Sequence, residues 1–356
     1  MSNARYSPRK TPQKCAECCI LGGQVCNICR FICSFALSKH YTDAQHRVNT
    51  YLPMQPIRTF DDMTAHLAGL RRVCRLAVVC GSDASTAGAV MRAVEAGFVE
   101  ALFVGDCAAV RQLPCVSAWS GGRVSYIEAG SQIEAAELAV TMVRQGQADL
   151  LMKGLLHTDT LLRAVLNKEW GILPRGEVLT HIAVAQIPSY HKLLFFSDAA
   201  VIPYPTQAQR MAQVGYMAQM LHAFGIDEPR IALVHCAETV SDKFPHTMGY
   251  GDICSRAARG EWGRVIVDGP LDLRTACDPV ALAVKGITSP VGGEADAVIL
   301  PDIEAGNLMY KALPLFASAR VAGTLQGTTA PVVLPSRGDS LEAKYHSLAL
   351  AAMSLN

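Results

Sequence analysis

Charged residues are scarce in this sequence, and no apolar run in it is long. The 356 residues are 50% hydrophobic and 18% charged, with a net charge of +1. A balance this close to zero gives no global field that would attract nucleic acid or an anionic membrane. Charged residues, Pro or Gly interrupt each apolar stretch before it could cross a bilayer, and no cleavable leader pattern follows the basic start at residues 1–10. We therefore expect a cytoplasmic protein with neither nucleic-acid nor membrane partners.

Motifs of several common enzyme classes are missing as well. There is no Gly-x-Gly-x-x-Gly after the first expected strand and no Gly-x-x-x-x-Gly-Lys-Ser/Thr anywhere. The usual dinucleotide fingerprint and the phosphate-binding loop of nucleotide hydrolases are therefore not indicated. His-Glu-x-x-His and Gly-x-Ser-x-Gly are also lacking. The sequence thus favours neither a zinc protease nor a serine hydrolase.

Cysteines are distributed unevenly along the chain. Six of the 13 lie between Cys15 and Cys33, where two Cys-x-x-Cys pairs are separated by seven residues. Such pairs can bind zinc or an iron–sulfur cluster, although this gap is short for a zinc ribbon. We expect residues 1–54 to be a disordered or non-native extension without a metal site, with metal binding as the alternative. The seven scattered cysteines are typical of small core residues in a reducing compartment.

From residue 55 onward, apolar strand-like runs alternate with helical segments. Strands are expected at 75–80, 101–105, 149–153, 193–196, 230–234, 264–268, 297–301, 320–323 and 331–334, and helices at 86–96, 131–144, 206–224 and 341–353. The strands are apolar on both faces, as in a sheet that helices cover on each side. The pattern predicts an α/β fold with parallel strands joined by right-handed crossovers.

Polar residues follow many of the expected strands. In open α/β sheets, ligands bind outside the carboxyl ends of the strands. The polar and small residues at or just after those ends are Lys153, Asp198, Asp268, Asp302, Gly306, Asn307, Ser336 and Arg337. Any single one of them is more often a helix cap or a surface residue than a ligand contact. As a set they indicate that several strand ends converge on a cleft.

The chemistry of the last strand end, residues 335–340, suits an anionic ligand. Arg337 offers a planar fork of donors for phosphate, and Ser336 adds a hydroxyl. The following helix, from residue 341, presents its N-terminus to the same place, which also favours an anion. Lys153, after another strand, could pair with a phosphate group. We expect the chemistry to take place at residues 335–340.

Five motifs in the second half of the chain resemble the phosphate acetyltransferase and phosphate butyryltransferase family. They occur in the family's order at residues 267–272, 286–296, 301–311, 319–323 and 331–340. The most specific is Pro-Asp-Ile-Glu-Ala-Gly-Asn-Leu-Met-Tyr-Lys at 301–311. The resemblance covers roughly residues 57–356 and excludes the cysteine-rich start.

This resemblance implies a fold with two α/β domains, each with a parallel doubly wound sheet, like isocitrate and isopropylmalate dehydrogenases. A cleft would lie between residues 55–197 plus 328–356 and residues 198–327, in a homodimer. The implied reaction converts a short acyl-CoA, butyryl or acetyl, and phosphate into acyl phosphate and CoA. Phosphate attacks the thioester directly, without a metal or other cofactor, so positioning and charge stabilisation carry the catalysis.

The resemblance also assigns roles to residues of this chain. Ser336 would stabilise developing charge or the CoA thiolate, and Arg337 would hold phosphate. The other positions expected to bind substrate are Lys153, Asp268, Asp302, Gly306, Asn307 and Asp339. One position departs from the acetyltransferase branch, where an Asp follows the serine by seven residues, because this chain has Ala343 there. That departure favours the butyryltransferase branch and leaves the general base unassigned.

Two other functions stay open on the sequence alone. A dehydrogenase of the β-decarboxylating type shares a related two-domain fold, but it needs metal-binding aspartates and a nicotinamide site that are not visible here. A non-catalytic CoA-binding regulator is compatible with the missing Asp.

Overall fold

The computed structural model describes residues 55–70 and 72–355, so the expected cysteine-rich extension lies outside the described residues. Its strands, in chain order, are β1 (Cys74–Val79), β2 (Val99–Gly105), β3 (Val124–Glu128), β4 (Leu150–Lys153), β5 (Thr180–Gln186), β6 (Leu193–Ser197), β7 (Arg230–Val234), β8 (Ile266–Leu271), β9 (Ala297–Ile299), β10 (Arg320–Gln326) and β11 (Val332–Val333). The nine strands expected from the sequence are all present, with shifted ends. Strands β3 and β5 were not predicted.

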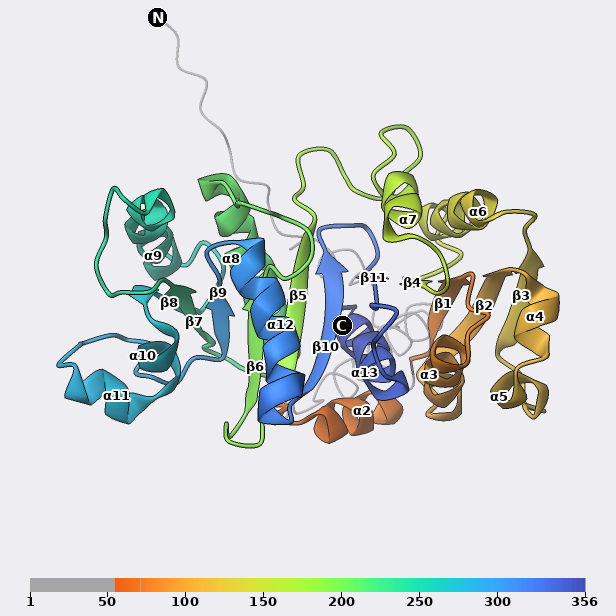
Figure 1. Ribbon diagram of the computed structural model, residues 1–356, viewed down its shortest axis with the longest axis horizontal. Helices are drawn as coiled ribbons and strands as arrows, with labels where there is room; N and C mark the ends of the chain where they lie inside the picture. The colour runs from red at the N-terminus through yellow and green to blue at the C-terminus, as the bar shows by residue number, and fades with distance from the viewer. Residues whose placement is uncertain (1–54, 71, 356) are drawn as a thin grey trace, which may run out of the picture. The chain divides into compact units, whose positions relative to one another are not determined.

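Helices surround these strands (Figure 1). They are α2 (Phe60–Gly69), α3 (Ala84–Glu95), α4 (Cys107–Arg111), α5 (Pro114–Ser117), α6 (Gln132–Arg144), α7 (Thr158–Val165), α8 (Gln207–Ala223), the 3₁₀ helix η1 (Pro245–Gly249), α9 (Tyr250–Ala258), α10 (Leu273–Cys277), α11 (Pro279–Val284), α12 (Ile303–Ala317) and α13 (Leu341–Met353). Side-chain caps begin many of them, as where Asp83 accepts the Thr86 N–H of α3 at 2.8 Å. In the part of the chain described, no helix is long and apolar enough to span a membrane.

The eleven strands of the described region form one mixed sheet in the order β3-β2-β1-β4-β11-β10-β5-β6-β9-β7-β8. Seven of the ten neighbouring pairs are parallel, and the three antiparallel ones, β11–β10, β10–β5 and β5–β6, lie in the middle. The expected α/β fold with a mostly parallel sheet is therefore confirmed. The expectation of two separate, wholly parallel sheets is wrong, because β10 returns antiparallel between β11 and β5 and joins the two halves.

This pairing divides the sheet into two halves whose strands run in opposite directions and which interlock at the antiparallel strands β10 and β5. Strands β1 to β4, β11 and β5 run one way, whereas β10, β6, β9, β7 and β8 run the other way. The carboxyl ends of the two halves therefore lie at opposite edges of the sheet. Strands β5 and β6, expected in the first domain, pair with β10 and β9, expected in the second. The division into residues 55–197 plus 328–356 and residues 198–327 stays a prediction.

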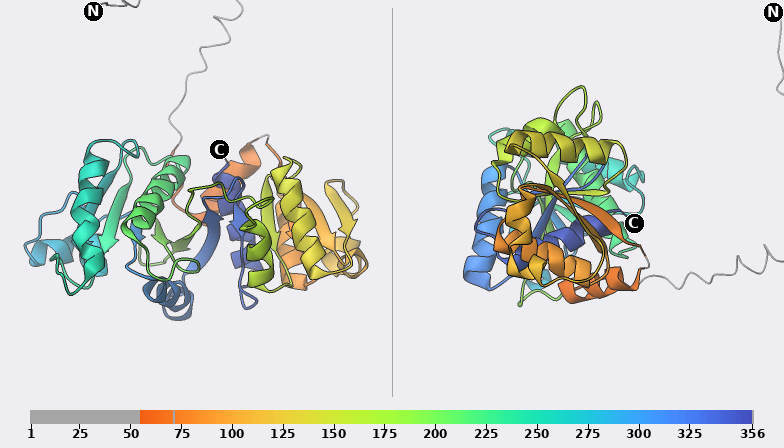
Figure 2. Two further views of the ribbon diagram at one scale, coloured as in Figure 1. Left: turned by 90° about the horizontal axis from the view of Figure 1, so that it is seen from above. Right: turned by 90° about the vertical axis from the view of Figure 1, so that its right-hand side faces the viewer.

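Alternate residues of each strand point into different cores, one on each face of the sheet. In β1, Leu76 and Val78 belong to the core that α2, α3 and α13 cover, and Ala77 and Val79 belong to the one under α6 and α7. Helices therefore lie on both faces, as Figure 2 shows from two further sides. Burial on both faces explains why the strands are continuously apolar.

Candidate functional site

The segment Pro335 to Ser340 forms a tight turn between β11 and α13. The Ser336 N–H donates to Asp339 Oδ2 at 2.8 Å, and the Asp339 N–H donates to the Ser336 carbonyl oxygen at 3.1 Å. Ser340 then caps α13 by accepting the Ala343 N–H at 3.1 Å. These bonds fix the turn while Ser336 and Arg337 remain exposed. The two residues expected to be catalytic are thus held on a closed turn and can reach a ligand.

Lys153 lies at the carboxyl end of β4, beside β11, because Leu151 and Met152 pair with Val332 and Val333. Its side chain is only 3% exposed. The ammonium donates to the carbonyl oxygens of Gly154 at 3.2 Å and Leu156 at 3.4 Å, and within the described chain no carboxylate forms an ion pair with it. A buried cation with only neutral partners carries a desolvation cost that an anionic ligand would offset.

The electrostatics place Lys153 among other cations. Burial lowers the pKa of its amine first, and the positive charges of Lys344 and Arg337 lower it further. Asp83 and Asp339 act in the opposite direction. Three cations and two carboxylates therefore share one neighbourhood at the carboxyl edge of this half of the sheet. An arrangement of this kind suits phosphate or the phosphate groups of a nucleotide-like ligand.

Lys344 is a member of this cluster that the sequence did not single out. It lies on α13, is 4% exposed, and donates to Asp83 Oδ1 at 3.3 Å, Ser85 Oγ at 2.6 Å and Thr86 Oγ1 at 3.0 Å. These bonds join α13 to the N-terminus of α3. A lysine in a helix whose second half is almost entirely apolar could have signalled a buried cation, since lysine is almost never fully buried without a partner.

Asp339 faces both the turn and helix α12. Burial raises the pKa of its carboxyl group, while the Ser336 N–H and the charges of Lys344 and Lys153 lower it. Its negative charge also adds to burial in raising the pKa of Tyr310, on α12. Helix α12 therefore passes close to the turn. The Arg337 side chain contacts a different element, because its Nη2 lies 3.4 Å from Nδ1 of His157, the residue that precedes α7.

The other four predicted residues lie elsewhere. Asp302 caps α12 by accepting the Ala305 N–H at 2.9 Å, and Asn307 donates to the Ala199 carbonyl oxygen at 3.1 Å. Asp268, in β8, accepts from Ser289 Oγ at 2.6 Å. Gly306 is buried against Asp198, and a side chain there would overlap the carbonyl oxygen of Asp198.

The expectation that all these strand ends converge is therefore wrong. Lys153, Ser336, Arg337 and Asp339 come together, whereas Asp268 and Asp302 belong to strands that run the other way and end at the opposite edge of the sheet. At that edge Asp302 lines a separate pocket of about 700 Å³ with Arg210 and His246. The Arg210 guanidinium in this pocket already donates hydrogen bonds within the protein, to the carbonyl oxygens of Leu300 at 3.3 Å and Pro301 at 2.9 Å.

The sequence and the fold of this chain are similar to those of known proteins. Residues 124–352 match the family model described as phosphate acetyl/butaryl transferase. The phosphate butyryltransferase of Clostridium beijerinckii is 36% identical over 296 residues, which are 83% of this chain and 97% of that protein. The phosphate acetyltransferase of Rhizobium meliloti is 33% identical over 301 residues, 85% of this chain and 94% of that one.

A solved structure is similar over the same region. The branched-chain phosphotransacylase from Enterococcus faecalis V583 superimposes with a TM-score of 0.70 at 30% sequence identity. The match covers 80% of this chain and 99% of that one. A match of this coverage includes both halves of the sheet.

Proposed function

This chain belongs to the phosphate acetyl/butaryl transferase family, as its motifs indicated, and we propose that it transfers a butyryl or acetyl group between coenzyme A and inorganic phosphate. The matched relatives named above are acyltransferases, so the dehydrogenase alternative has no observation in its favour. The non-catalytic alternative is a question for the activity assay below.

The observation that carries this proposal is the buried, unneutralised ammonium of Lys153 beside Arg337. Phosphate between the two would supply the negative charge that Lys153 lacks, and Arg337 could hold it through two parallel hydrogen bonds. Ser336, exposed on the same turn, offers a hydroxyl for the thioester oxygen or the departing sulfur.

The reaction balances without a further reactant. An oxygen of hydrogen phosphate attacks the thioester carbonyl carbon, the new C–O bond forms, and the C–S bond breaks. Cleavage of the C–S bond releases the CoA thiolate, which takes up the proton of hydrogen phosphate, so the products are acyl phosphate and CoA with a free thiol. The cations at the turn favour the negative charge that collects on phosphate and on the carbonyl oxygen in the transition state. We propose that no metal or cofactor takes part.

We further propose that the two halves of the sheet correspond to two domains of the isocitrate dehydrogenase-like type, with the substrate cleft between them. Their opposite strand directions and the change of direction at β10 support this division. We also propose that the enzyme works in the cytoplasm as a homodimer. Exposed apolar side chains on α12, among them Leu308 and Phe316, support a second copy as the partner.

The test is to incubate the protein with butyryl-CoA or acetyl-CoA and to follow free thiol with and without phosphate. We expect phosphate-dependent release, and a fall of about 100-fold or more in kcat/KM when Arg337→Ala removes a charge-stabilising donor. Arg264→Ala is the matched control, because Arg264 is an exposed arginine paired with Glu228 away from the turn. Absence of thiol release with every short acyl-CoA would rule out the proposed function.

A further inference from the structure

A small pocket lies directly behind the catalytic turn. It has a volume of about 310 Å³ and is bounded by the end of α12, the start of β10 and the first turn of α13. Gly338, Asp339 and Ser340 form one wall, so the pocket is continuous with the segment that carries Ser336 and Arg337. The pocket therefore adjoins the turn on which we propose that the substrate binds.

Much of the remaining wall is aliphatic. Pro314, Ala319, Val321 and Ala343 all line the pocket. Val321 and Ala319 are both 7% exposed, so these two wall residues also belong to the buried interior. Aliphatic walls favour an alkyl group over a charged one, because binding then removes apolar surface of the ligand from water.

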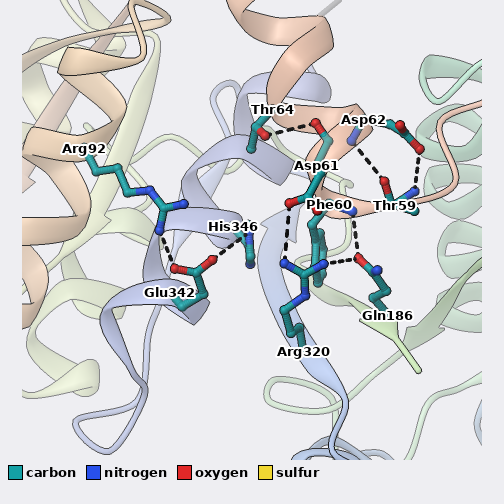
Figure 3. A network of polar contacts seen from close by, with 10 residues as sticks. All are labelled: Thr59, Phe60, Asp61, Asp62, Thr64, Arg92, Gln186, Arg320, Glu342 and His346. Atoms are coloured by element: carbon teal, nitrogen blue, oxygen red, sulfur yellow. Dashed lines mark hydrogen bonds and ion pairs between the residues drawn. The ribbon is translucent and has the colours of Figure 1, made fainter. Parts of the chain in front are cut away.

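Two of the charged residues of the pocket, Arg320 and Glu342, already have partners, as Figure 3 shows. Arg320 donates to Gln186 Oε1 at 2.9 Å and lies 3.5 Å from Asp61 Oδ1. Glu342 forms an ion pair with Arg92 and lies 3.5 Å from His346 Nε2. These groups therefore satisfy one another around the rim, and they do not need a charged ligand.

Ala343 is the position where the sequence departs from the acetyltransferase branch, and it is one of the residues that line this pocket. An Asp at this place would fill part of the pocket and add a carboxylate beside Asp339 and Glu342. A methyl group leaves that space open and adds no further carboxylate. The same substitution that removes the expected base thus creates room behind the turn.

We propose that this pocket holds the alkyl end of the acyl group and that Ala343 sets the chain length the enzyme accepts. The inference rests on the proposed acyl transfer, and it adds the binding site for the chain. The thioester carbonyl would lie at the turn near Ser336, with the second to fourth carbons of the chain against Ala343 and Val321. Pockets of this kind discriminate between chains that differ by one methylene by roughly 10- to 200-fold.

The test compares kcat/KM for acetyl-, propionyl-, butyryl- and valeryl-CoA in the native enzyme and in variants. Ala343→Leu and the milder Ala343→Val reduce the pocket. They should lower kcat/KM for butyryl-CoA by about 10-fold or more and change it for acetyl-CoA by less than about threefold. Val321→Ala enlarges the pocket and should shift the preference toward valeryl-CoA.

Ala109→Leu is the matched control. Ala109 is also half-buried at the third position of a helix, where its N–H donates to the capping Asp106 at 2.9 Å, and it does not line the pocket. It should leave the chain-length profile unchanged. If Ala343→Leu fails to fold, Ala343→Val and Val321→Ala carry the test.

Two results would overturn the inference while leaving the acyl transfer intact. One is an unchanged ratio of butyryl to acetyl activity in folded Ala343 variants, and the other is an equal loss with both substrates. No phosphate-dependent thiol release by the native enzyme, with any chain length, would instead contradict the proposed function itself.

Discussion

At the scale of single residues, we propose that Lys153 combines a cost in stability with a use in binding. Its ammonium is buried against neutral carbonyl oxygens only, and its pKa is lowered by that burial. Replacement by Met keeps the aliphatic stem and removes the charge. We expect Lys153→Met to raise the free energy of unfolding by about 1–2 kcal/mol, because sites that serve function often lower stability.

The same variant should lose the response to phosphate. Phosphate that binds only the folded state raises the midpoint of thermal unfolding of the native protein. In Lys153→Met we expect a smaller rise at equal phosphate concentration, measured by calorimetry. Lys243→Met, at an exposed loop position, is the control. A less stable Lys153→Met protein that still responds fully to phosphate would contradict this assignment.

Single residues also show how far the sequence could predict the site. Ser336 and Arg337 were found because a specific motif contains them, and Lys153 was found because it ends a strand. Lys344 was missed, since its contacts with Asp83 and Ser85 join positions about 260 apart in the chain. Such contacts depend on how α13 packs against α3, and no local pattern carries that information.

At the scale of elements, the close packing of α12 against the chain segment that follows β6 depends on one glycine. A Cβ at Gly306 would overlap the carbonyl oxygen of Asp198. Gly306→Ala should therefore lower the free energy of unfolding by about 3 kcal/mol, the cost of overpacking a site that cannot yield.

Gly251→Ala is the matched helical control, because nothing lies within 4 Å of a Cβ there. It should raise stability by about 0.5–1 kcal/mol in the same denaturant titration. Equal effects of the two changes would mean that α12 can shift away from Asp198.

Helices α2 and α13 meet through a buried histidine. The His346 ring stacks on Phe60 at a centroid distance of 4.3 Å, and its side chain is 1% exposed (Figure 3). Burial lowers the pKa of this imidazole from 6.5 to about 4. Glu342 opposes that effect, and the charges of Arg320 and Arg92 add to it. The ring is therefore neutral in the folded protein at neutral pH.

This pKa predicts a loss of stability in acid. Above pH 6.5 neither state binds the proton, so His346 has no effect there. Between pH 6.5 and about 4 the unfolded chain binds a proton that the folded chain does not, and the free energy of unfolding falls as the pH falls. The loss should reach about 3–4 kcal/mol, from 2.5 pH units at about 1.4 kcal/mol each. His346→Phe, which preserves the stacking, should remove this component. Denaturation curves at several pH values would contradict the prediction if both proteins lost the same stability.

The elements themselves were largely predictable, but their directions were not. Apolar runs with polar ends indicated nine of the eleven strands of the described region. Whether a strand is parallel or antiparallel is defined only relative to the strands it pairs with. The sequence of β10 resembles that of the other apolar runs, although β10 is antiparallel to β11 and β5. For this reason the sequence placed Asp268 and Asp302 in the same cleft as Lys153.

At the scale of the whole molecule, the division of the sheet into two opposed halves decides which residues can form a site together. Strand ends of one half contribute Lys153 and the turn after β11. The other half contributes α12, whose residue Tyr310 lies near Asp339. The candidate site that we propose therefore combines strand ends of one half with a helix of the other.

The exposed face of α12 leads to the prediction for the assembly. Leu308, Leu315 and Phe316 on this helix are 71%, 73% and 82% exposed, and the first two are seven residues apart and so lie on one face. Exposed apolar groups of this size on one helix are typical of a surface that another chain covers.

We expect the native protein to sediment with twice the mass of one chain. The double change Leu308→Glu and Phe316→Glu should give a single-chain mass at micromolar concentration, because it places carboxylates where the second copy would bury apolar surface. Ile133→Glu, on α6 at 62% exposure, makes the same chemical change elsewhere and should leave the dimer intact. A native protein that sediments as a monomer, or a double variant that stays dimeric, would show that α12 is not the interface.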